Sequence, residues 1–233
     1  MSMGERGFIP LWPLPLAAAL LLLVATHLAL WLSIQAGHVP ACVPYWEGCT
    51  SISRAARHGL GNHLFRLLVI PCAVLHGATW WVAGHWLRDD GGKAARRWML
   101  ALGLFSASAL AIYATFLGTE GEVYGFLRRY GVTVYFGFGF LAQLLLMRRA
   151  RVLRLMPPAT LKAMAVLCLA MLGLGVGNVV AGALVADDAL RDRIENALEW
   201  QLGLLLVGWH LLLARGWWRA RFGLRLYRGE EPL

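Results

Sequence analysis

The sequence has little charge for its length. Only 15% of its 233 residues are charged, whereas 59% are hydrophobic and eleven are Trp. A soluble domain of this size does not carry so many long apolar runs, so the composition excludes that class and predicts a polytopic membrane protein. The net charge of +9 would suggest a nucleic-acid partner in a soluble protein. Here most arginines lie between apolar runs, so the charge indicates membrane topology and no nucleic-acid binding.

Familiar catalytic and metal-binding motifs are also lacking. The sequence has no HExxH or CxxC spacing, and no GxSxG elbow that would mark a nucleophilic serine. Besides His210, three further histidines, His27, His76 and His85, lie within apolar runs. We therefore expect no metal and no other cofactor. The two halves of the chain show no internal repeat, which argues against a small transporter.

Six apolar runs are long enough to cross a bilayer. They span about residues 9–35, 63–87, 98–118, 131–147, 163–186 and 195–215, and a basic tail follows at 216–233. The first run is too long for the hydrophobic core of a signal peptide, so we expect it to be retained as an anchor. The expected fold class is all-α, with six transmembrane helices forming a single membrane domain.

The distribution of lysine and arginine predicts the orientation. The N-terminus, the second and fourth connections and the tail hold fifteen of the 22 Lys and Arg residues, and the other three connections with Arg66 hold seven. By the positive-inside rule both termini are cytoplasmic, and the first, third and fifth connections lie outside. Arg outnumbers Lys twenty to two, which is typical of a GC-rich bacterial genome. The expected location is a bacterial inner membrane, or the Golgi, ER or plasma membrane of a eukaryotic cell.

Cysteine and glycine positions suggest two further contacts. Cys42 and Cys49 lie in the first outer connection, an oxidising compartment, where a disulfide is expected and two free thiols are the alternative. Small residues repeat every four positions from Gly103 in the third span, and Gly173 and Gly177 form a GxxxG in the fifth. Both patterns permit close helix packing, which we expect to be intramolecular, with a homodimer interface as the alternative.

The last apolar run contains two polar side chains that lipid does not tolerate without a partner. Glu199 and His210 are eleven residues apart, which places them about 20° apart around a helix and about 16 Å apart along it. Ionisable groups inside a membrane normally face the bundle interior or a wet cavity, and they mark candidate functional sites. The structural alternative is that both groups are hydrogen bonded to neighbouring helices.

Polar side chains gather at the predicted outer face. The candidate residues, from the outer connections and the adjoining span ends, are Ser51, Ser53, His58, His63, Arg66, Glu120, Glu122, Arg129, Asn178 and Glu199. A basin with both signs of charge suits a lipid head group that carries phosphate, amine or sugar. The alternative is a solvated rim of local ion pairs, each of which contributes little.

Two stretches together resemble the Frag/DRAM/Sfk family of six-helix membrane proteins. TSISRAARHGLGNHLFRLLVI, residues 50–70, contains Ser51-Ile52-Ser53 and Phe65-Arg66, and LEWQLGLLLVGWHLLLARGWW, residues 198–218, contains Glu199-Trp200 and Trp209-His210. The match is nearest to the branch that remodels GPI-anchor lipids. Family members carry a His before the fourth span, where this chain has Arg128-Arg129-Tyr130. A bacterial member would also lack GPI anchors, so that pathway does not transfer directly.

The resemblance implies an outer-face site for membrane lipids and lipid remodelling, with acyl transfer or hydrolysis as the reaction class. In that reading Arg66 pairs with a phosphate, and Ser51 or Ser53 contacts the ester or sugar region. Glu199 orients the head group or acts as a base, and His58, His63 or His210 is a further candidate for proton transfer. The alternative, implied by other branches, is a non-enzymatic scaffold or regulator of lipid metabolism that uses its basic tail.

Overall fold

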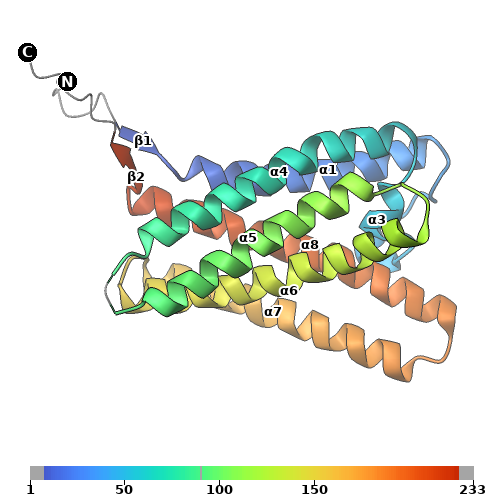
Figure 1. The fold of residues 1–233 in the computed structure, drawn as a ribbon. Helices are drawn as coiled ribbons and strands as arrows, with labels where there is room; N and C mark the ends of the chain where they lie inside the picture. Colours follow the sequence, from blue (N-terminus) through green and yellow to red (C-terminus); the bar gives the residue numbers. More distant parts are fainter. Residues whose placement is uncertain (1–7, 90, 226–233) are drawn as a thin grey trace, which may run out of the picture.

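The computed structural model describes residues 8–89 and 91–225 and consists mainly of six long helices (Figure 1). These are α1 (Pro13–Gln35), α4 (Gly59–Trp86), α5 (Lys93–Phe116), α6 (Glu122–Val152), α7 (Pro158–Leu184) and α8 (Asp188–Arg219). All six have the length and apolar composition to cross a membrane. The predicted all-α class with six spans is therefore confirmed, whereas the cytoplasmic placement of the termini stays a prediction.

Short elements mark the two ends of the bundle. Helices α2 (Pro44–Glu47) and α3 (Ile52–Ala55) lie in the connection between α1 and α4, at what we call the α3 end. Strand β1 (Phe8–Pro10) pairs antiparallel with β2 (Gly223–Arg225) at the opposite end, which we call the β end. This ladder, which the sequence did not predict, brings both ends of the described chain to one side of the bundle, as an even number of spans requires (Figure 1).

All of the long helices except α1 begin before the apolar runs that predicted them. Helix α6 covers Glu122–Val152, whereas the apolar pattern indicated only 131–147. Charged residues that flank a span can also form helix. The helical backbone continues outside the hydrocarbon region, where a charged side chain is solvated and costs no free energy of burial. The true ends are set by local capping instead. At the start of α8, for example, the Asp187 carboxylate accepts hydrogen bonds from the backbone N–H groups of Ala189 and Leu190.

The six helices pack in chain order around a ring. Contacts run from α1 to α4, α5, α6, α7 and α8, and α8 returns to α1. Helix α4 approaches α5 closely at Gly103, where an added Cβ would lie 2.3 Å from Cγ of Trp80. The bulky indole is fully buried because the facing residue has no side chain. The small residues of the third span therefore serve intramolecular packing, as predicted.

Helix α7 departs from this packing at the α3 end. A Cβ added at Gly173 or Gly177 would meet no atom of the described chain within 4 Å. Val179 and Leu184 are 72% and 78% exposed. The expected intramolecular contact of this GxxxG is therefore wrong. Figure 1 shows the corresponding halves of α7 and α8 diverging from the rest of the bundle. In a bilayer, this half of α7 faces lipid or another protein.

Candidate functional site

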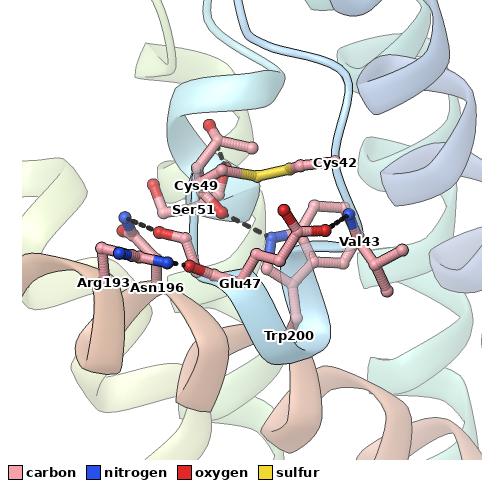
Figure 2. Close-up of a disulfide and its surroundings, with 10 residues drawn as sticks. Cys42, Val43, Glu47, Cys49, Ser51, Arg193, Asn196 and Trp200 are labelled. Carbon is pink, nitrogen blue, oxygen red and sulfur yellow. Dashed lines mark hydrogen bonds between the residues drawn. A yellow bond between two sulfur atoms is a disulfide. The ribbon is translucent and has the colours of Figure 1, made fainter.

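Side chains of helix α8 bind backbone carbonyl groups of the connection between α1 and α4. Its side-chain donors are Arg193, Asn196, Trp200 and Gln201, which donate to the carbonyls of Glu47, Gly48, Thr50 and Tyr45 at 3.0, 2.9, 2.9 and 2.8 Å, respectively. Asn196, Trp200 and Gln201 lie three, seven and eight residues after Arg193, so the four donors share one face of the helix. Three of these four bonds are visible in Figure 2. The connection between α1 and α4 is thereby fixed to the last span.

A disulfide closes the same connection. Cys42 and Cys49 are bonded, with their Cα atoms 6.6 Å apart, as the sequence predicted (Figure 2). Inside the loop, the Glu47 carboxylate accepts a 2.7 Å hydrogen bond from the Val43 amide. Gly48 has φ +59°, and a Cβ there would lie 1.8 Å from the carbonyl oxygen of Arg193. Only glycine allows this loop to lie directly on the backbone of α8.

The loop places α3 against Glu199. Ser51 caps α3 and accepts a hydrogen bond from the Arg54 amide at 3.1 Å. The Ser53 amide donates to the Glu199 carboxylate at 3.3 Å, and the hydroxyls of Ser51 and Ser53 are 3.1 Å apart. Arg54 also makes a bidentate pair with Asp192 of α8, at 3.0 and 3.1 Å, and this hydrogen bonding raises the pKa of Arg54. Two adjacent residues in the middle of α3 are thus tied to α8.

Two cavities meet at Glu199. The outer one, which we call the vestibule, has a volume of about 650 Å³ and is lined by polar groups that include Ser53, Arg57, Tyr113, Glu122, Arg128 and Glu199. The inner one, the chamber, is narrow, at about 40 Å³, and mainly apolar, with Phe65, Leu110, Phe136 and Val207 in its wall. Tyr113, Val132 and Glu199 line both cavities. One side of the carboxylate therefore faces polar groups and the other faces apolar side chains.

Side-chain hydrogen bonds to backbone carbonyl groups stabilise the wall of the vestibule. Arg128 donates to the carbonyl oxygens of Phe116 and Thr119, where α5 ends. The buried amide of Asn62 donates to the carbonyls of Ala56 and Leu117, at 2.9 and 3.0 Å, and so joins the turn after α3 to the same end of α5. These bonds satisfy carbonyl groups that a helix end leaves without partners. The position of the Arg128 guanidinium is thus fixed by its own neighbours.

Some of the residues proposed from the sequence lie in this site and others do not. Ser53, Glu122 and Glu199 line the vestibule, and Ser51 supports Ser53. The residues that line neither cavity are His58, His63, Arg66, Glu120 and Asn178. His58 is exposed and its ring lies 5.2 Å from that of His38, and Asn178 is exposed on α7. The side chain of Arg129 lies outside the described part of the chain.

His210 belongs to a different cluster, deep in the bundle. Its ring lies 4.4 Å from that of His76, and its Nδ1 is 2.9 Å from the Leu206 carbonyl oxygen. Nε2 of His76 is 3.4 Å from the Tyr135 hydroxyl. His210 lines neither the vestibule nor the chamber. Its hydrogen bond to Leu206 lies within α8, and its buried Nε2 has no hydrogen-bond partner among the described residues, so it meets α4 through the ring of His76 and not through the interhelical hydrogen bond that the structural alternative expected.

Sequence reasoning assigned no role to several residues that shape the site. Arg57 and Arg128 line the vestibule, whereas Arg66, which the sequence proposed as the phosphate ligand, does not. Asn196 and Trp200 were also missed. Their signal was a carboxamide and an indole four residues apart, and hence on one face of the last helix, a pattern that favours hydrogen bonding to a partner segment.

Among the described residues, no group of three or more His, Cys, Asp or Glu side chains is arranged to hold a metal ion. Comparison with known proteins yields no matching family model, no matching curated protein and no matching solved structure. The resemblance to the Frag/DRAM/Sfk family therefore stays a prediction, and the functional argument depends on the geometry of the vestibule.

Proposed function

We propose that this integral membrane protein binds a phosphate-bearing lipid head group in the vestibule and takes part in lipid remodelling by acyl transfer. The observation that carries the proposal is the position of Glu199, at the boundary between a polar and an apolar cavity and beside two arginines. The family resemblance adds support. Its two motifs lie 146 residues apart in sequence and are in contact through the Ser53 amide and Glu199.

The charges of the vestibule suit a phospholipid. Arg57 is exposed and Arg128 is held by carbonyls, so both guanidinium groups offer donors with the fork geometry that phosphate oxygens accept. Glu122 and Glu199 add acceptors for an amine or hydroxyl elsewhere in the head group. The narrow apolar chamber leaves no room for that head group beyond Glu199. The acyl chains would remain in the bilayer, beside the exposed half of α7.

Glu199 is the candidate group for proton transfer. As a base it would accept the proton of an acceptor hydroxyl while that oxygen attacks the ester carbonyl, and it would return the proton to the departing alcohol. A serine nucleophile fits less well, since the Ser53 hydroxyl contacts Ser51 and the carboxylate contacts the Ser53 amide. None of the described residues that line the vestibule is a histidine.

A second candidate function is a non-enzymatic regulator that binds lipid without altering it. The hydrogen bond from the Ser53 amide to Glu199 favours this candidate, because it gives the carboxylate a structural task at the start of α3. Lipid binding is common to both functions. They differ in whether Glu199 is needed for turnover or only for the position of α3.

The test uses the purified full chain and three variants: Arg57→Gln, Glu199→Gln and Arg66→Gln. Arg66→Gln is the matched control, because it removes the same charge from a residue that lines neither cavity. Native mass spectrometry measures which phospholipids are retained, and a fluorescent phospholipid donor with a lysolipid acceptor measures acyl transfer. We expect Arg57→Gln to weaken retention about fivefold, as loss of one phosphate contact implies, and Arg66→Gln to have no effect.

Glu199→Gln separates the two functions. Acyl transfer predicts a loss of about 10²- to 10⁴-fold in turnover with lipid still bound. Absence of turnover in the wild-type protein, together with selective lipid retention, would favour the regulator. Equal retention by wild type, Arg57→Gln and Arg66→Gln would refute the vestibule as a head-group site.

A further inference from the structure

A third cavity, larger than the vestibule and the chamber, lies at the β end, at the opposite end of the bundle from the vestibule. It has a volume of about 1020 Å³ and is formed by the end of α6, the start of α7 and the end of α8. Five cationic side chains line it: Arg148, Arg151, Arg154, Lys162 and Arg219. None of the described residues that line it is acidic. We call it the basic cavity.

The positive-inside rule explains why cations lie at this end, but not why they converge. That rule requires only an excess of Lys and Arg in the connections. Here the cations come from three helices and their connections, and they surround a single hollow. At the β end, Asp89 pairs with Arg149, a residue outside the lining. Among the described residues, no carboxylate therefore stands in the wall of the basic cavity beside its five cations.

The rest of the lining is apolar. Leu144, Met147, Leu155 and Leu161 share the wall with the cations, and all lie on α6, α7 or the turn between them. A free inorganic anion gains nothing from such a surface. A molecule with phosphate at one end and alkyl chains at the other satisfies both parts, since chains bury apolar area while the phosphates meet the arginines.

Arg154 occupies a backbone position that normally takes glycine. Its φ is +52°, and it follows the last turn of α6. The Leu155 amide donates to the Ala150 carbonyl and the Arg154 amide to the Arg151 carbonyl, which is the Schellman pattern of a helix end. Arg221, with φ +48°, occupies the equivalent position after α8, but it does not line the basic cavity. The chain thus provides two arginines in the same conformation, only one of them at the cavity.

We propose that the basic cavity binds an anionic phospholipid whose head group carries two phosphates. Five cations exceed what one phosphodiester neutralises, and the cavity volume exceeds that of the vestibule. Basic pockets between helices at the cytoplasmic end of membrane proteins bind head groups of this chemistry. The site is independent of the vestibule, because it shares no lining residue with that cavity.

The test compares Arg154→Gly with Arg221→Gly in the full-length protein. Each variant removes one positive charge and relieves the same left-handed strain, so both are expected to fold. Purified protein in detergent is titrated with cardiolipin, phosphatidylglycerol or phosphatidylcholine, and native mass spectrometry counts the bound lipid. We expect cardiolipin to bind most tightly. Arg154→Gly should weaken cardiolipin binding about fivefold, and Arg221→Gly should leave it within twofold of the wild type.

Two results would overturn the proposal. Equal weakening in both variants would show that net charge, rather than the cavity, attracts the lipid. Cardiolipin binding no tighter than phosphatidylcholine binding would show that no anionic site exists. An excess of inorganic phosphate distinguishes the source of the ligand. Displacement of cardiolipin by phosphate alone would assign the cavity to a soluble anion, whereas unchanged lipid binding supports the phospholipid.

Discussion

Gly48 offers the sharpest test of how the loop between α1 and α4 contacts α8. We predict that Gly48→Ala destabilises the protein strongly, because two costs coincide at this position. The residue is left-handed, with φ +59°, and an added Cβ would lie 1.8 Å from the Arg193 carbonyl oxygen. Backbone atoms of a long helix cannot move aside as a flexible side chain can. The loop must therefore leave α8.

The expected magnitude follows from the contacts that this displacement breaks. The left-handed conformation costs a non-glycine residue about 1–2 kcal/mol. Moving the loop also breaks the bond from the buried Asn196 amide to the Gly48 carbonyl, at 2.9 Å, which leaves polar groups unsatisfied at about 1–3 kcal/mol. The total is about 2–5 kcal/mol. For a chain of this length, that corresponds to a fall in melting temperature of about 4–20 °C.

Gly37→Ala is the matched control. Gly37 is also left-handed, with φ +72°, but a Cβ there meets nothing within 4 Å in the described chain. The Gly37→Ala substitution should therefore lower the free energy of unfolding only by the cost of the left-handed conformation, about 1–2 kcal/mol. A thiol-reactive fluorophore follows thermal unfolding in detergent, because the free thiols of Cys72 and Cys168 are buried in the folded protein. Equal melting temperatures for the two variants would refute the close approach of the loop to α8.

Two further predictions concern single hydrogen bonds. Trp200→Phe keeps the aromatic packing but removes the indole N–H that donates to the buried Thr50 carbonyl. We expect it to destabilise the protein by about 1–3 kcal/mol, measured in the same thermal assay. An unchanged melting temperature would contradict this bond. At the β end, the hydrogen bond from Arg149 holds the pKa of Asp89 below its ordinary value. Because the folded pKa is the lower one, the pair stabilises the protein above the unfolded pKa of about 4, and this stabilisation is lost as pH falls through the folded value. The melting temperature, followed by tryptophan fluorescence, should therefore fall less steeply below about pH 5 in Asp89→Asn than in the wild type, and identical slopes would argue against the pair.

The fold class was predictable because it depends on composition and run length. Each span needs about twenty apolar residues, and a lipid-exposed backbone must form helix to satisfy its own hydrogen bonds. These requirements act locally, so six runs predict six helices without knowledge of their neighbours. Helix ends were less predictable. Capping by Asp187 and the left-handed turn at Arg154 decide them, and hydropathy carries no information about either.

The candidate site was predictable only in part. Glu199 was found because a carboxylate in an apolar run has few reasons to be there. The choice of Arg66 over Arg57 as the phosphate ligand failed to anticipate that α3 and its turn carry Arg57 to the vestibule, whereas α4 directs Arg66 elsewhere. Nothing in either residue's local sequence distinguishes them. Their separation follows from how the disulfide loop rests on α8.

The sequence by itself determined that this is a six-helix membrane protein, whereas it left a Cys42–Cys49 disulfide and two free thiols as alternatives, of which the structure has the disulfide. Tertiary structure alone decided which polar groups meet. Side chains on α8 bind carbonyls about 150 residues earlier in the chain, and the basic cavity forms only where three helices end together. Hydrophobicity and helix propensity act along the chain, whereas these sites depend on packing between helices, which specifies neighbours that the linear sequence does not.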